Sequence, residues 1–176
     1  MTNLKNYLEA KVNSRGNKNL NYLSSFFSET ELAILSNKTI SIVGTNGKSS
    51  TANNIAMLLK GLDKSYIAFT SPHLFDYKER MTAHKDLNFN EYIQYLENFE
   101  LKNNINLGYF ESTFLIAAKA FLHNDMDYFI CEAGIGGKYD TTSVIQSKTV
   151  VLTSIGLDHT DISVSYTHLR AHETVV

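Results

Sequence analysis

The chain has 176 residues, of which 43% are hydrophobic and 19% charged, and its formal net charge is -2 at pH 7. This length suffices for one domain with its own core, and the near-neutral charge excludes the broad basic field with which proteins attract nucleic acid or anionic membranes. The single cysteine, Cys131, excludes an internal disulfide framework, and no apolar run approaches the roughly 20 residues that cross a bilayer or forms a secretory signal, so we expect a cytoplasmic protein.

The first 36 residues predict helices. Apolar side chains recur at helical spacing over residues 3–36, and Gly16 with its polar neighbours separates a first helix from a second. Ser28 stands directly before the segment from Glu29 to Leu35, where a serine hydroxyl can accept a hydrogen bond from a free backbone N–H. We therefore predict that Ser28 is the N-cap of a helix.

A strand, a glycine-rich turn and a helix come next. Residues 39–43 (TISIV) form a short β-branched run typical of a buried strand, and they lead directly into residues 44–51 (GTNGKSST). The helical pattern after this turn ends at Gly61, and residues 66–69 (YIAF) predict a second strand.

The rest of the chain continues this alternation. The predicted elements are a loop over 70–88 that contains the only proline, Pro72, a helix over about 89–103 capped by Asn88, a helix over about 112–123, and buried strands at 128–131 and 149–153. Strands that alternate with helices predict an α/β fold with a mostly parallel sheet and flanking helices. In such a fold, ligands bind at the carboxyl ends of the strands.

Residues 44–49 have the composition of a phosphate-binding loop. Glycines let backbone N–H groups approach phosphate oxygens, the helix N-terminus adds positive potential, and Lys48 supplies a charge for the β- and γ-phosphates. The match is partial, because Ile42 stands where the full Walker pattern has its first glycine. This motif alone leaves open a glycine-rich turn with a solvated lysine.

Two further polar motifs follow predicted strands. Glu132 comes directly after the strand at 128–131, and a carboxylate there, beside a phosphate loop, can hold the Mg²⁺ of a nucleotide. Asp158 and His159 follow the strand at 149–153. Taken singly, these motifs also fit a surface acid in a flexible turn and a surface or capping histidine.

Six segments are more informative about function together than singly. In chain order they are GTNGK (44–48), TSPHL (70–74), ERM (79–81), FESTF (110–114), EAGIGGKYDTT (132–142) and SIGLDHT (154–160). In this order they resemble the folylpolyglutamate/dihydrofolate synthase branch of the Mur ligase superfamily, over about residues 1–161. The resemblance implies a P-loop NTPase-like, Mur-ligase-type ATP-binding domain over residues 1–163.

The resemblance also implies roles for individual residues. The expected phosphate contacts are Gly44, Thr45, Asn46, Gly47, Lys48, Ser49 and Ser50. The expected Mg²⁺ ligands are Ser71, Glu132, His159 and the hydroxyl of Ser49. The expected substrate contacts are His73, Arg80 and Glu111, and the expected catalytic residues are Lys48, Glu132 and His159.

Three positions depart from the family pattern. Ser49 stands where this branch usually has glycine, as in the murein branch. Lys138 and Ser143 replace an arginine and an asparagine that are common in the glycine-rich segment. Lysine keeps the charge of arginine but loses its bidentate fork, which puts a direct role of Lys138 in doubt.

The function that the resemblance implies is ATP-dependent ligation. With ATP and Mg²⁺, such an enzyme converts a carboxylate of dihydropteroate or a folate into an acyl phosphate, which the amine of L-glutamate then attacks. The expected state of the complete enzyme is a monomer. A murein-peptide ligase of the same superfamily and a nucleotide-binding module without ligase activity are the alternatives.

The resemblance ends near residue 161. Residues 164–176 resemble a translated sequencing adapter, with a native polar extension as the alternative, so His168 and His172 receive no role despite their spacing. The carbamylated lysine of the family and its C-terminal glutamate-side domain lie beyond this point. We therefore expect a truncated chain that binds nucleotide weakly at best and catalyses nothing by itself.

Overall fold

A computed structural model of the chain describes residues 3–12, 19–134 and 140–155. The helices are α1 (Leu4–Lys11), α2 (Leu20–Ser24), α3 (Glu29–Lys38), α4 (Lys48–Gly61), α5 (Ile93–Asn103) and α6 (Tyr109–His123). The strands are β1 (Thr39–Val43), β2 (Tyr66–Phe69), β3 (Met81–Ala83), β4 (Tyr128–Glu132) and β5 (Thr149–Leu152). Short 3-10 turns are η1 (Tyr77–Arg80), η2 (Phe89–Tyr92) and η4 (Thr141–Val144). None of the helices in these ranges is long and apolar enough to cross a membrane.

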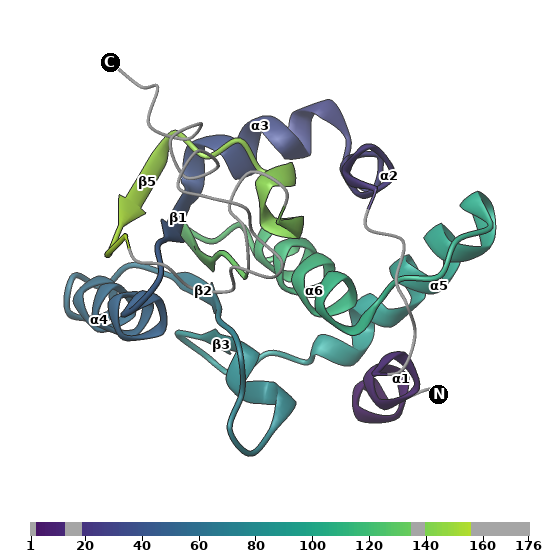
Figure 1. Cartoon of the computed structure of the whole chain (residues 1–176), viewed down its shortest axis with the longest axis horizontal. Helices are drawn as coiled ribbons and strands as arrows, with labels where there is room; N and C mark the ends of the chain where they lie inside the picture. The colour runs from purple at the N-terminus through teal and green to yellow at the C-terminus, as the bar shows by residue number, and fades with distance from the viewer. Residues whose placement is uncertain (1–2, 13–18, 135–139, 156–176) are drawn as a thin grey trace.

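The strands form one mixed sheet in the order β3-β2-β4-β1-β5 (Figure 1). Strand β1 pairs in parallel with β4 and β5, and β2 pairs in parallel with β4. Only β3, which is antiparallel to β2, breaks the pattern. The carboxyl ends of β1, β2 and β4 therefore meet at one edge, as the predicted mostly parallel α/β fold requires.

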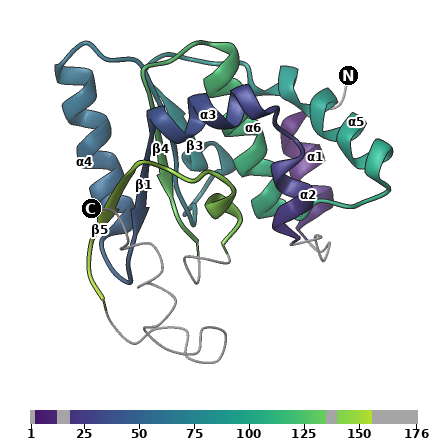
Figure 2. The same cartoon turned by 90° about the horizontal axis from the view of Figure 1, so that it is seen from above.

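Helices cover both faces of the sheet. Helix α4 lies on one face, and α3, α6 and the remaining helices lie on the other (Figure 2). Successive side chains of the central strands point to opposite faces. On the α4 side the buried strand residues are Ile42, Tyr66, Ala68 and Ile130, and in the larger core on the α6 side they are Ile67, Phe69, Phe129 and Cys131.

The predicted helix caps are present. Ser28 accepts a hydrogen bond from the backbone N–H of Glu31 through its hydroxyl, and the Glu31 carboxylate accepts one from the backbone N–H of Ser28. This capping box satisfies two donors that the start of α3 would otherwise leave free. The side chain of Asn88 caps the 3-10 turn that leads into α5. Gly16, the predicted break between helices, lies outside the described residues.

Three expectations need correction. The predicted loop over 70–88 contains the turn η1 and the strand β3, which is too short to show a sequence period. Helix α6 starts at Tyr109, three residues before the predicted start at 112. Strand β5 is exposed, with Leu152 at 42% exposure, because it lies at the edge of the described sheet and pairs there only with β1.

A half-buried ion pair joins the start of α3 to α6. The ammonium of Lys119 lies 2.5 Å from the Glu31 carboxylate and over the rings of Phe26 and Tyr95. We expect Lys119→Met to lower the free energy of unfolding by about 1–3 kcal/mol at pH 7, because Glu31 loses a charge-assisted hydrogen bond. Lys5→Met is the control, since the Lys5–Glu9 pair is exposed and its loss should change stability by less than about 0.5 kcal/mol.

This prediction includes a pH dependence. Partial burial acts to raise the pKa of Glu31, but the hydrogen bonds from Lys119 and Ser28 outweigh it and lower that pKa below its ordinary value. The stability that the lowered pKa represents is fully present above the unfolded-state pKa, about 4.3, and is lost as pH falls through the folded-state value. Urea unfolding of the parent and of Lys119→Met from pH 7 to pH 3 should show the difference in their free energies of unfolding shrink. A constant difference would contradict the ion-pair explanation.

Candidate functional site

The segment between β1 and α4 forms a glycine-rich loop over residues 44–47. Gly44 and Gly47 have φ angles of 134° and 84°, in the region that favours glycine. Gly47 is the N-cap of α4, and within the described ranges no side chain caps this helix end. The first N–H groups of a 14-residue helix therefore face the loop with their positive potential.

Lys48 folds back over this loop. Its ammonium donates to the backbone oxygens of Gly44 at 2.9 Å and of Thr45 at 3.2 Å. The loop is also joined to the segment after β5. The backbone N–H of Thr45 donates to the carbonyl of Ser154 at 2.8 Å, and that of Asn46 donates to the Ser154 hydroxyl at 3.0 Å. A cation and a helix N-terminus thus converge on one loop, which is the arrangement that binds phosphate groups.

Gly44 has no room for a side chain. A Cβ atom there would lie 2.2 Å from the Thr153 hydroxyl and 2.8 Å from the Ser154 carbonyl oxygen. We expect Gly44→Ala to destabilise the fold by about 1–3 kcal/mol and to displace the loop. Gly61→Ala is the matched control, because a Cβ atom at that position would meet nothing within 4 Å and the substitution should be neutral or slightly stabilising. Thermal unfolding of both variants measures the effect; equal stability would contradict the steric argument.

Glu132 lies at the carboxyl end of β4 and is 2% exposed. Its carboxylate accepts hydrogen bonds from the Ser49 hydroxyl at 3.0 Å and from the backbone N–H of Ser71 at 3.1 Å. Burial raises the pKa of Glu132, although these two bonds and the charges of Lys48 and Arg80 act to lower it. Because the effect of burial outweighs that of these partners, a further cation beside Glu132 would stabilise its ionised form.

The described residues fit a Mg²⁺ ion that a nucleotide brings with it. Among the described residues, no cluster of three or more His, Cys, Asp or Glu side chains could hold a metal by itself. Mg²⁺ commonly takes one or two carboxylates and completes its shell with water and phosphate oxygens. Glu132 and the Ser49 hydroxyl supply such a partial set of ligands. Ser71, the third predicted ligand, contacts the Glu132 carboxylate through its backbone N–H. The fourth predicted ligand, His159, lies outside the described residues.

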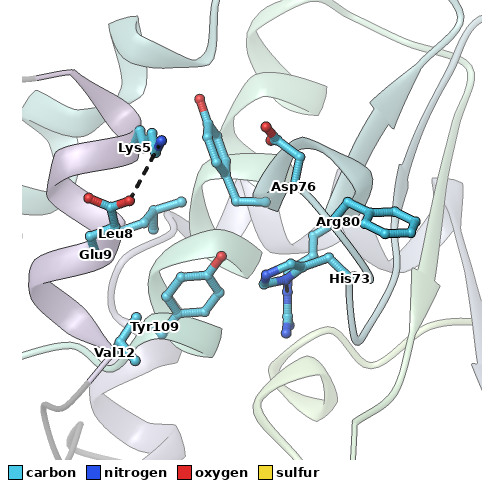
Figure 3. A pocket seen from close by; sticks show the side chains of 10 residues that line it. Lys5, Leu8, Glu9, Val12, His73, Asp76, Arg80 and Tyr109 are labelled. Atoms are coloured by element: carbon cyan, nitrogen blue, oxygen red, sulfur yellow. Dashed lines mark hydrogen bonds and ion pairs between the residues drawn. The ribbon is translucent and has the colours of Figure 1, made fainter.

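A cavity of about 510 Å³ lies between α1 and the loop over residues 71–80. Figure 3 shows Lys5 and Glu9 of α1 on one side of it and His73 and Arg80 on the other. Tyr109, at the start of α6, also lines it, as do the side chains of Phe75 and Tyr77. The lining therefore combines aromatic rings with two cations, Lys5 and Arg80, and two carboxylates, Glu9 and Asp76, which suits a planar ligand with polar groups.

His73 and Arg80 form a pair inside this cavity. The Nε–H of Arg80 donates to Nδ1 of His73 at 2.7 Å. The Arg80 guanidinium lies 5.1 Å from the centroid of the Tyr109 ring. Burial lowers the pKa of Arg80, while Tyr109 and Glu132 act in the opposite direction.

Glu111 lies apart from the other predicted substrate contacts. It belongs to the first turn of α6, is 3% exposed, and accepts a hydrogen bond from the Thr141 hydroxyl at 3.4 Å. It does not line the cavity described above, so its predicted contact with substrate stays a prediction. The prediction omitted Tyr109, although its position just before the Phe-Glu segment could have indicated it.

The sequence of the chain matches that of a known domain. The Mur ligase middle domain matches residues 42–172, which reach into the segment over 164–176 that the sequence analysis sets apart. The chain belongs to the Mur ligase family. Residues 156–176 lie outside the described part of the structure, so the boundary at 163 stays a prediction.

Several proteins that are similar to this chain are named dihydrofolate synthase/folylpolyglutamate synthase or folylpolyglutamate synthase. A dihydrofolate synthase/folylpolyglutamate synthase of Buchnera aphidicola is 37% identical over 162 residues, which are 88% of this chain and 37% of the relative. The structure of Escherichia coli FolC in complex with DHPP and ADP is similar, with a TM-score of 0.75 and 30% identity over 89% of this chain and 38% of FolC. A bifunctional enzyme of the same name with Mn, AMPPNP and L-glutamate bound has a TM-score of 0.72 and 30% identity, over 92% of this chain and 39% of that one.

Proposed function

We propose that this chain is the nucleotide-binding part of an ATP-dependent ligase that joins L-glutamate to dihydropteroate or a folate. The observation that carries the proposal is the convergence of Lys48, Ser49 and Glu132 at the carboxyl ends of neighbouring parallel strands. Solved relatives support it, since one holds ADP with DHPP and another holds AMPPNP, Mn and L-glutamate. The chain spans 37% of the length of its Buchnera relative, so the activity proposed is that of a protein of full length.

The chemistry needs like charges to approach one another. A substrate carboxylate must attack the terminal phosphate of ATP, and both groups are anionic. Lys48 and the N-terminus of α4 would hold the phosphates and offset their charge. Mg²⁺, held by Glu132, Ser49, Ser71 and His159, would neutralise charge on the phosphate oxygens. The resulting acyl phosphate would then react with the amine of L-glutamate to give an amide, with ADP and phosphate as the other products.

The cavity beside α1 would receive the pterin substrate. Its aromatic side chains, Phe75, Tyr77 and Tyr109, can pack against a planar ring, and Arg80 offers a cation to a carboxylate. The Arg80 pair occupies Nδ1 of His73, and Nε2 is the other ring nitrogen that a ligand could contact.

The decisive experiment compares substrates in a protein that carries this chain at the full length of its relatives. With Mg-ATP and L-glutamate, dihydropteroate or a folate should yield ADP and the glutamyl amide. Turnover with a UDP-sugar peptide in its place would instead show a murein-peptide ligase. Binding of Mg-ATP without turnover of any of these acids would leave only a nucleotide-binding module. Isothermal titration of the 176-residue chain with Mg-ATP tests the nucleotide site directly.

We further propose that the full-length protein is a cytoplasmic monomer with neither nucleic acid nor membrane as partner, and that residues 1–163 form the ATP-binding unit. The near-neutral net charge supports the absence of a nucleic-acid partner. Light scattering of the full-length protein would test the monomer, and removal of residues 164–176 should leave its thermal stability and nucleotide affinity unchanged.

A further inference from the structure

The loop that lines the cavity is braced by a single carboxylate. Glu79 accepts hydrogen bonds from three successive backbone N–H groups, those of Leu74 at 2.8 Å, Phe75 at 3.0 Å and Asp76 at 2.9 Å. Three donors on one ionised side chain are a strong local restraint, because charge-assisted hydrogen bonds are stronger than neutral ones. These bonds, led by that of Leu74, lower the pKa of Glu79, so it stays ionised at neutral pH.

The same residue is also fixed at the base of the loop. The carbonyl of Glu79 accepts from the Thr70 hydroxyl at 3.0 Å, and the next carbonyl, that of Arg80, accepts from the backbone N–H of Thr70 at 3.0 Å. Glu79 therefore joins the end of β2 through its backbone and the tip of the loop through its side chain.

The residues whose N–H groups Glu79 binds include two apolar ones with exposed side chains. Leu74 is 82% exposed and Phe75 is 94% exposed, yet Phe75 lies at the rim of the cavity. An exposed phenylalanine gains free energy by burial, so the loop would fold over the cavity unless its backbone were held. His73 precedes the restrained residues and Arg80 follows Glu79 directly, so the pair that lines the cavity depends on the same loop conformation.

We propose that Glu79 is a positioning residue that holds this loop open for the aromatic, anionic substrate and presents Phe75, His73 and Arg80 to it. The inference rests on the proposed function for the nature of the substrate. The restraint of the loop by Glu79 does not depend on that function. Glu79 itself does not line the cavity and lies outside the glycine-rich loop.

The test uses the full-length protein that carries this chain and its Glu79→Gln and Glu79→Ala variants, with Glu91→Ala as the matched control. Glu91 is an exposed glutamate in η2, another 3-10 turn, and does not line the cavity. Hydrogen exchange should accelerate at least tenfold at the amides of residues 74–76 in both Glu79 variants and remain unchanged in β2 and in the control. The Kd for dihydropteroate should rise at least tenfold, while the Kd for Mg-ATP changes less than twofold.

Each outcome decides the inference. Unchanged exchange at residues 74–76 would overturn it, as would a dihydropteroate Kd within twofold of the parent, or a parallel loss of Mg-ATP affinity that indicates general unfolding. If Glu79→Ala does not fold, Glu79→Gln gives the decision, since it keeps the size of the side chain. If the full-length parent binds neither dihydropteroate nor a folate, the proposed function is contradicted, and faster exchange in Glu79→Gln still supports the brace.

Discussion

Replacing Lys48 by alanine should abolish ligation in the full-length protein. Lys48 is the first residue of α4, and its ammonium lies on the carbonyls of Gly44 and Thr45, directly over the phosphate loop. In the proposed reaction two anions approach each other, and Lys48 brings a positive side chain onto this loop. Loss of one such preorganised group typically lowers kcat by about 10²–10³-fold, and charge-stabilising groups in phosphoryl transfer can contribute more.

The measurement is steady-state formation of ADP with dihydropteroate and L-glutamate. Lys60→Ala is the control, because Lys60 lies on the same helix, at its exposed last turn, and should leave turnover unchanged. Titration of both variants with Mg-ATP separates binding from catalysis. A Lys48→Ala enzyme that keeps a substantial part of the parent rate would remove Lys48 from the mechanism and return the loop to a glycine-rich turn with a solvated lysine.

The glycine-rich loop was predictable because its determinants are local. The β-branched run over 39–43, the glycines at 44 and 47, and the helix that ends at Gly61 all appear in the structure with the expected bounds. Both glycines have positive φ angles, a conformation that glycine adopts more readily than any other residue. The placement of Glu132 beside Ser49 and Ser71 follows in turn, since parallel strands bring their carboxyl ends to one edge.

Features that depend on distant parts of the chain were not predictable in the same way. Strand β5 has the β-branched composition of a buried strand, yet its exposure is set by the order of strands in the sheet. Strand β3 has three residues and owes its existence to β2 beside it. The pair of Arg80 with His73 needs the loop conformation that Glu79 imposes. The direction of Glu111 depends on which face of α6 meets the segment at Thr141.

A second large effect is expected at Glu132. We expect Glu132→Gln to lower kcat/KM of the full-length protein by at least about 100-fold. Changes to the outer partners of metal ligands already cost about 10–100-fold in affinity or activity, and loss of a direct carboxylate ligand should cost more. The amide can keep the local contacts, because its oxygen can accept from the Ser71 N–H while its NH₂ donates to the Ser49 hydroxyl. The expected defect is therefore specific to Mg²⁺ and should appear as a loss of Mg²⁺-dependent nucleotide binding in calorimetry.

The same substitution should stabilise the chain when metal is absent. Burial raises the pKa of Glu132, so ionisation of this carboxyl is less favourable in the folded state than in the unfolded one. The free energy of unfolding of the parent therefore falls as pH rises from the unfolded-state pKa, about 4.3, to the raised folded-state value, and stays reduced at pH 7. Glutamine does not ionise, so in EDTA the variant should unfold at a higher temperature than the parent at pH 7, with the gap closing below pH 4. Glu91→Gln, at an exposed site, should show neither effect.

The opposite result would contradict this explanation. If Glu132→Gln is less stable than the parent at pH 7, the hydrogen bonds from Ser49 and Ser71 outweigh the cost of burying the charge. The protein alone would then stabilise the carboxylate, without need of a cation.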